Sequence, residues 1–221
     1  MMKGDQPVKE DTNINKIIKK LCKETFPGDV FQKGNSRVYL DDNGYYFTMA
    51  EFQPYSLRKG TFLNVGLSFL FTKEDYLSFS YSYHHEARIG KKFIAYIDDE
   101  QFEKEVREYV SLANEYILKY RKFAEIDYAK RHIINELDDT NWNPYIKSMF
   151  YFLTDNRENG IKYYKMFLDD PFFKRIITEY QYPTDIEELN KEYVMNMIRE
   201  QRKYWHSKST MKKMKIAEKY E

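Results

Sequence analysis

The sequence has 221 residues, enough for one sizeable domain or two small ones, and its 42% hydrophobic and 32% charged residues are typical of a globular protein. With 36 basic and 35 acidic residues the net charge is +1, so no global field draws nucleic acid, an anionic membrane or an acidic substrate to it. The single cysteine excludes an intrachain disulfide, and together with a polar start that lacks an apolar signal segment it predicts a cytoplasmic protein.

The first predicted element is a helix that follows a flexible N-terminus at residues 1–13. Thr12 or Asn13 can cap this helix. Its apolar face has the spacing i, i+3, i+4, i+7 and consists of Ile14, Ile17, Ile18 and Leu21. Cys22 borders that face. A nucleophilic cysteine needs a base and an electropositive setting, whereas a cysteine beside an apolar stripe is typically part of the core.

Extended structure is predicted next. Asp42-Asn43-Gly44 is a signal for a tight hairpin turn in which Asn and Gly take positive φ, and residues 54–60 form a second connection. Regular alternation of apolar and polar side chains is typical of antiparallel sheets with one fully buried face. The predicted strands are residues 37–41, 45–53, 61–71, 77–85 and, as a fifth, 93–97.

From Asp98 the apolar residues recur with the spacing of a helix instead of that of a strand. Apolar residues from Phe102 to Tyr120 predict a long amphipathic helix, with Asp98 or Asp99 as its cap. This helix can cover the apolar face of the sheet, so residues 14–123 are interpreted as one α+β unit.

Residues 124–206 are predicted to be helical and to pack on the sheet domain, because no linker rich in Gly, Ser or Pro separates the two parts. Residues 207–221 form a basic tail. The fold class is therefore α+β: an N-terminal helix, an antiparallel meander of four or five strands, a long covering helix and an all-helical C-terminal half. The signals that start the later helices are Asn143-Pro144, Asp170-Pro171, and Thr184 with Glu187 as a capping box.

Aromatic residues make up 18% of the chain, with 21 Tyr and 16 Phe. Because tyrosine is amphipathic, this excess predicts rings at the rim of the core with their hydroxyls in water. The alternative is an interaction surface rich in tyrosine.

The polar face of the predicted sheet is the candidate ligand site. Its side chains are small or form hydrogen bonds, and they could line a groove if the C-terminal helices arch over them. The alternative is a plain solvent face. The candidate residues are Asn64, Ser68, Ser80, Ser82 and His84.

An enzyme would need a histidine beside a carboxylate in a pocket. His84 is one candidate, and His132 lies one helical turn from Glu136, although that spacing is common on solvated helix faces. No catalytic residue is assigned. Neighbouring strand residues point to opposite faces, so His84 and His85 could not share one ion, and neither a metal nor a cofactor is expected.

The C-terminal residues offer a nucleic-acid alternative, because basic side chains interleaved with aromatic ones are used to bind single strands. A solvated helix end with a charged tail is the other interpretation, and the near-neutral chain favours it. The residues concerned are Arg202, Lys203, Trp205, Lys208, Lys212 and Lys213.

The first half carries three strand-and-turn motifs: Phe31-Gln32-Lys33-Gly34 followed by Tyr39, the Asp-Asn-Gly hairpin leading into Phe52-Gln53, and Phe62-Leu63-Asn64-Val65-Gly66. With these motifs residues 14–123 resemble an uncharacterised bacterial family, domain-of-unknown-function family 4304. The resemblance implies a helix-flanked antiparallel sheet of bacterial origin. It implies no activity and no catalytic residues.

No nucleophile–base pair or metal constellation stands out, so we expect a non-catalytic module whose partner is a protein or a small ligand. The helical half would build or cover the site. An immunity or defence role is compatible with such a protein by analogy only. The enzyme and nucleic-acid alternatives stay open, and no membrane partner is expected.

Overall fold

A computed structural model describes residues 12–82, 86–90, 92–211 and 214 of the chain. Its centre is a five-stranded antiparallel sheet in the order β1-β2-β3-β4-β5, which confirms the predicted meander. The edge strands β1 and β5 have two residues each, and β1 was not predicted. The strands are β1 (Phe31–Gln32), β2 (Val38–Asp42), β3 (Tyr46–Tyr55), β4 (Arg58–Phe69) and β5 (Ile94–Ala95).

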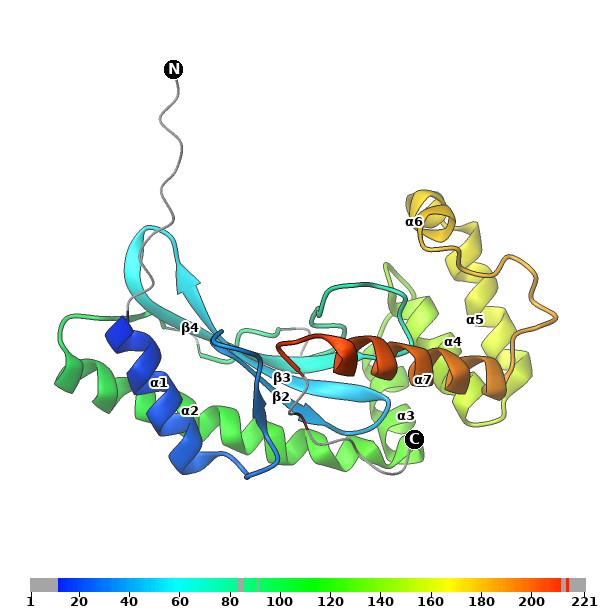
Figure 1. Ribbon diagram of the computed structural model, residues 1–221. Coiled ribbons are helices and arrows are strands. Elements are labelled where there is room, and N and C mark those ends of the chain that lie inside the picture. The colour runs from blue at the N-terminus through cyan, green and yellow to red at the C-terminus, as the bar shows by residue number, and fades with distance from the viewer. Residues whose placement is uncertain (1–11, 83–85, 91, 212–213, 215–221) are drawn as a thin grey trace, which may run out of the picture.

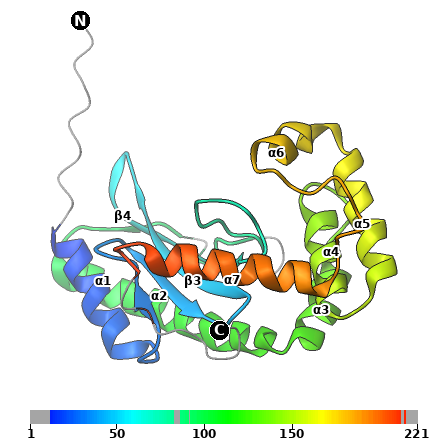
Figure 2. The ribbon, with the colours of Figure 1, turned by 45° about the vertical axis from the view of Figure 1, so that its right-hand side comes forward.

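Helices make up most of the rest of the fold. They are α1 (Thr12–Thr25), α2 (Asp99–Tyr120), α3 (Ile126–Glu136), α4 (Asn143–Leu153), α5 (Arg157–Asp169), α6 (Lys174–Glu179) and α7 (Lys191–Ser207), with short 3-10 turns η2 (Arg121–Ala124) and η3 (Pro171–Phe173). Figure 1 shows α1 and α2 on one face of the sheet and α7 passing over the other, while α4, α5 and α6 gather at the end far from the β3–β4 hairpin. Figure 2 shows the same arrangement. Within the described part of the chain, no helix combines the length and apolar character needed to cross a membrane.

The covering role predicted for the long helix is confirmed. Asp98 caps α2, since its side chain accepts a hydrogen bond from Gln101 N at 2.8 Å. The helix packs on β3 and β4, where Val65 and Leu67 are fully buried. The alternation of β4 therefore places its apolar side chains under α2.

Both hairpin turns differ in detail from the prediction. Between β2 and β3, Asn43 N donates to Tyr46 O at 3.1 Å, and within this turn only Gly44 has a positive φ, of +94°. The register therefore places Gly44-Tyr45 in the loop, one residue later than predicted, and the side-chain amide of Asn43 bonds to the carbonyl of Asp41 at 3.0 Å. The β3–β4 connection is shorter than predicted, because the strands extend until Tyr55 pairs with Arg58.

The predicted strand at 77–85 is wrong for its described residues. Its described residues run beside β4 and form one isolated bridge, between Leu67 and Tyr81. Ser80 gives a physical reason. Its hydroxyl accepts the hydrogen bond of Phe69 N at 3.2 Å, in the place where a paired strand would present a main-chain carbonyl.

The predicted capping box of Thr184 with Glu187 is also wrong, because α7 begins later. Its cap is Asn190, whose side chain accepts from Tyr193 N at 2.9 Å. Asp185 competes at the predicted site, since its carboxylate accepts from Glu187 N at 2.9 Å and holds a turn instead of a helix.

Four fully buried tyrosines bond to main-chain carbonyls, so the prediction that tyrosine hydroxyls reach water is wrong for them. Tyr46 donates to the carbonyl of Tyr120 at 2.7 Å, and Tyr45 to that of Phe123. Tyr120 is the last residue of α2 and Phe123 lies in the η2 turn that follows it, where the end of a helix leaves acceptors without an intrahelical partner. The other two pairs are Tyr145 with Phe71 and Tyr164 with Pro183.

Candidate functional site

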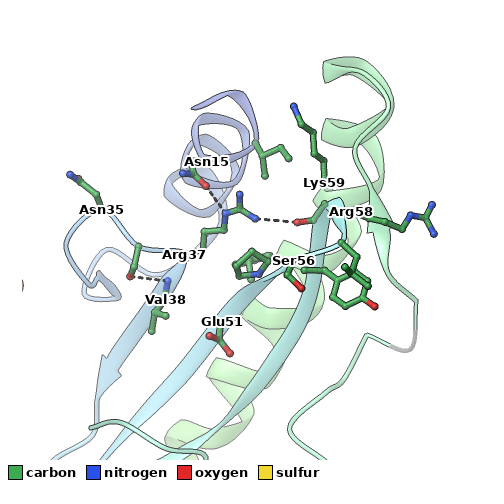
Figure 3. Close-up of a pocket in the computed structure, with 15 residues that line it drawn as sticks. Asn15, Asn35, Arg37, Val38, Glu51, Ser56, Arg58 and Lys59 are labelled. Atoms are coloured by element: carbon green, nitrogen blue, oxygen red, sulfur yellow. Dashed lines mark hydrogen bonds between the residues drawn. The ribbon is translucent and has the colours of Figure 1, made fainter. Parts of the chain in front are cut away.

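A cavity of about 640 Å³ lies between the N-terminal end of α1, the start of β2 and the tip of the β3–β4 hairpin (Figure 3). Its apolar and aromatic lining comes from all three elements and consists of Ile14, Val38, Phe52, Pro54, Tyr55 and Leu57. Its charged lining consists of three cations and one carboxylate: Arg37, Arg58, Lys59 and Glu51. A cavity of this size with a few polar groups is typical of small-molecule sites.

Arg37 connects the walls of this cavity. Its Nε donates to Asn15 Oδ1 of α1 at 2.5 Å, and its Nη1 donates to the carbonyl of Gly60 at 3.1 Å. Figure 3 shows the guanidinium between the helix and the hairpin, with both bonds drawn. The side chain is half-buried. A guanidinium held in this way is a fixed, planar donor, which is the geometry that recognises carboxylates and phosphates.

Gly60 shapes the hairpin beside Arg37. Its φ is +148°, and the β3–β4 register shifts nearby, between Gln53 and Tyr55. A Cβ atom at this position would lie 2.1 Å from the carbonyl oxygen of Ile94 in β5. Only glycine fits this close approach, so the residue type at position 60 determines where the carbonyl that accepts from Arg37 lies.

The tip of the hairpin forms the outer rim of the cavity. Arg58 and Lys59 are exposed, and Figure 3 shows both side chains pointing away from Arg37. Leu57 is 78% exposed. The rim is therefore cationic and carries one large apolar side chain in solvent.

The predicted polar-face residues lie elsewhere, beneath the segment that follows β4. A Cβ atom at Gly66 would lie 2.4 Å from the hydroxyl of Ser82, which shows how closely this segment covers the strand. Three of the candidates are almost fully buried and Ser80 is half-buried; none of the four lines the cavity described above. The three buried ones are Asn64, Ser68 and Ser82, at 6%, 4% and 7% exposed.

Asn64 is held by its neighbours on β3. Its side-chain amide donates to Glu51 Oε2 and to Gln53 Oε1, both at 3.0 Å. These bonds satisfy a polar side chain that the covering segment removes from water. The fifth candidate, His84, lies outside the described residues.

The candidates for nucleic-acid binding are divided between interior and surface. Arg202 and Trp205 are 3% and 5% exposed, so neither lies on a basic surface. Lys203 is exposed, and the half-buried Lys208 has its Nζ 3.9 Å from the ring centroid of Tyr204. Lys212 and Lys213 lie outside the described residues.

Arg202 joins α7 to the β2–β3 hairpin. Its Nη1 and Nη2 donate to the two carboxylate oxygens of Asp42 at 2.7 and 3.0 Å, and Nη1 also donates to the carbonyl of Gly44 at 2.7 Å. Asp42 is itself 3% exposed in its side chain. The pair is a buried, bidentate ion pair, and such a pair is strongly destabilised when one partner is removed.

His206 lies beside this ion pair, with its Nε2 3.7 Å from Asp42 Oδ2. Burial lowers the pKa of His206; the Asp42 carboxylate opposes this shift and the Arg202 charge adds to it. The unfolded chain therefore takes up this proton more readily than the folded one, and the His206 contribution to stability falls as pH drops below about 6.5.

We expect the free energy of unfolding, measured in urea between pH 7.5 and 5.5, to fall less steeply in a His206→Gln variant than in the unmodified protein. The reason is that glutamine keeps a polar side chain without a titrating ring. Equal slopes in the two proteins would contradict this assignment.

His132 and Glu136, the residues named for the enzyme alternative, form hydrogen bonds to other residues and not to each other. His132 Nδ1 lies 2.9 Å from the carbonyl of Tyr128, and Glu136 accepts from the hydroxyl of Tyr81. Burial raises the pKa of Cys22 to about 12, so its thiol stays protonated at neutral pH. Among the described residues, no three His, Cys, Asp or Glu side chains come together to hold a metal.

The cavity at the hairpin was missed because residues 54–60 were interpreted as a plain connection. One signal was present. The run Ser56-Leu57-Arg58-Lys59 places an apolar residue beside two cations, a combination that a binding rim also uses.

No protein-family model, curated protein or solved structure matches the chain. The resemblance of residues 14–123 to domain-of-unknown-function family 4304 therefore stays a prediction. Function has to be argued from the cavity and its side chains.

Proposed function

We propose that this chain is a non-catalytic binding protein, and that the cavity between α1 and the β3–β4 hairpin takes a small ligand with an apolar body and one anionic group. The observation that carries the proposal is the position of Arg37. This half-buried cation lies at the centre of an otherwise largely apolar lining and is held by bonds to two different elements.

The apolar lining supports an organic ligand rather than a free inorganic anion. Val38 is a half-buried side chain of the wall, and the exposed Pro54 and Leu57 extend the wall to the hairpin tip. Removing apolar ligand surface from water at this wall supplies affinity, at about 25 cal/mol per Å² before the entropy cost of binding.

Fixed geometry supports binding with little reorganisation. The hydrogen bonds of Arg37 are already present without a ligand, so its guanidinium does not have to be ordered on association. The described lining residues contain one carboxylate, Glu51, and neither histidine nor cysteine, a set suited to recognition.

The test compares two fluorescent probes that share an aromatic body. Anilinonaphthalene sulfonate carries an anionic group and phenylnaphthylamine does not. We expect Arg37→Gln to weaken binding of the sulfonate about tenfold or more, because a hydrogen bond to a charged group contributes about 1.5–3 kcal/mol. Binding of the neutral probe should change less than about twofold by the same reasoning.

The matched control is Arg131→Gln, which removes the same charge from an exposed position on α3. It should leave both probes unaffected. The proposal fails if Arg37→Gln changes both probes equally, or if Arg131→Gln has the same effect as Arg37→Gln.

A further inference from the structure

Three aromatic rings gather on the β5 side of the β3–β4 hairpin, whereas the Arg37 cavity lies on its α1 side. Tyr55, Phe62 and Phe93 contact one another, with ring centroids 5.9, 5.8 and 4.9 Å apart for the pairs Tyr55–Phe62, Tyr55–Phe93 and Phe62–Phe93. They line a second cavity, of about 470 Å³. Tyr55 is 42% exposed and the other two rings are half-buried, so ring surface faces solvent.

Two exposed arginines lie over these rings. The guanidinium carbon of Arg88 is 4.0 Å from the centroid of Phe62, and that of Arg58 is 5.7 Å from the centroid of Phe93. Arg88 is also fixed by a hydrogen bond to β3, in which its Nη2 donates to Gln53 Oε1 at 2.8 Å. We call these five residues, Tyr55, Phe62, Phe93, Arg58 and Arg88, the aromatic–arginine surface.

Both charged residues of the aromatic–arginine surface are cations. Within the described chain no carboxylate forms an ion pair with Arg58 or Arg88, and none lines the second cavity. Arg88 uses two of the five N–H donors of a guanidinium, on Gln53 and Asn64. The contact with Phe62 and the two hydrogen bonds restrict Arg88, so a partner that binds it loses less side-chain entropy.

We propose that the aromatic–arginine surface binds an acidic segment of a partner protein. Carboxylates of the segment pair with Arg58 and Arg88, and an apolar or aromatic side chain packs against Tyr55 and Phe93. Tyrosine and arginine are the residue types that most often anchor protein interfaces. Leu57, which is 78% exposed at the adjoining tip, adds apolar contact area.

A nucleic acid fits this surface less well. Phosphate backbones are followed by cations spread along a groove several nucleotides long, whereas here two arginines flank one compact ring cluster. The net charge of +1 gives no wider attraction for a polyanion. An exposed leucine at the edge of the surface also suits an apolar side chain rather than a phosphate.

This inference goes beyond the proposed ligand site. Tyr55 and Arg58 line both cavities, so Arg88→Gln is the variant that tests the aromatic–arginine surface alone. Arg88 and Phe93 line the second cavity and not the first, while Arg37 and Asn15 line the first and not the second. One binding function can therefore fail without the other.

The experiment measures fluorescence anisotropy of a fluorescein-labelled dodecapeptide of alternating glutamate and tyrosine, titrated with the full chain in 50 mM NaCl. We expect saturable binding that weakens at least fivefold in Arg58→Gln and in Arg88→Gln. Arg58 makes no hydrogen bond that its replacement could break within the described chain, so Arg58→Gln should fold normally. Arg131→Gln should stay within twofold of the unmodified protein.

Two further probes separate the alternatives. The same peptide with glutamine in place of glutamate should bind at least tenfold more weakly, and a labelled twelve-nucleotide thymidine oligomer should bind more weakly than the acidic peptide. Lack of peptide binding at 100 µM protein would overturn the proposal. So would equal binding of the glutamine peptide, unchanged affinity in both arginine variants, or tighter binding of the oligomer.

Discussion

Replacing Arg202 by alanine is expected to lower the free energy of unfolding by about 3–5 kcal/mol, the largest effect of any single charged side chain considered for this protein. The substitution leaves the carboxylate of Asp42 at 3% exposure without the guanidinium that now donates to both of its oxygens. It also removes the donor to the carbonyl of Gly44. A buried charge without its partner keeps its full desolvation penalty, and urea or guanidinium denaturation monitored by circular dichroism measures the loss.

The matched control is Arg199→Ala on the same helix. Arg199 is more exposed and bonds to Glu192 and Asn196 near the surface, so its removal should cost less than about 1 kcal/mol. The double variant Arg202→Ala with Asp42→Ala should lose less stability than the sum of the two single variants, because it leaves no buried charge behind. A loss below 1 kcal/mol for Arg202→Ala would show that the ion pair does not hold α7 on the hairpin.

Replacing Gly60 by alanine is expected to destabilise the protein by about 1–3 kcal/mol from its backbone conformation alone, since φ of +148° is reserved for glycine. The true loss should exceed that range, because the new Cβ would have to displace the Ile94 carbonyl that lies 2.1 Å away. The Gly60 carbonyl accepts from Arg37, so binding of anilinonaphthalene sulfonate should weaken in the same variant.

Gly28→Ala provides the control for Gly60→Ala. No atom lies within 4 Å of the position that its Cβ would take, so the same chemical change should alter stability by less than about 0.5 kcal/mol. If both variants were equally stable, the close approach of β5 to the hairpin would be wrong, and with it the geometry of the cavity.

These two positions test different connections of the fold. Arg202 joins the helical half to the β2–β3 hairpin. Gly60 lies in β4 at the point where this strand pairs with the short edge strand β5. The two proposed sites adjoin the β3–β4 hairpin, and rigid elements position site residues more precisely than loops do, so the proposals depend on a firmly held hairpin.

Much of the fold follows from signals that act within a few residues. The long helix α2 was predicted with its cap, because Asp98 bonds to an amide three residues along the chain and the apolar period is visible in the sequence. The order of the strands was predicted for a similar reason, since an Asn-Gly turn joins neighbouring strands. Where local signals competed, as at Thr184 and Asp185, the prediction failed.

The candidate site depended on contacts that no local pattern contains. Arg202 is separated from Asp42 by 160 positions, so a basic residue in a charged stretch could be read equally well as surface or as interior. Ser68 and Ser82 looked like solvent-facing residues, because nothing in an alternating strand shows that a later segment lies across it. The role of Arg37 could not be predicted for the same reason. Its two acceptors, Asn15 and Gly60, lie 22 positions before it and 23 positions after it.

The α+β class, the meander and the helix that covers it could be predicted from the amino-acid sequence, because each rests on periodicity and on caps formed by near neighbours. The buried polar side chains, the cavity at the hairpin and the arginines at the surface became visible in the packed fold. Burial and ion pairing depend on contacts between residues that are far apart in the sequence, and no short stretch of sequence contains those contacts.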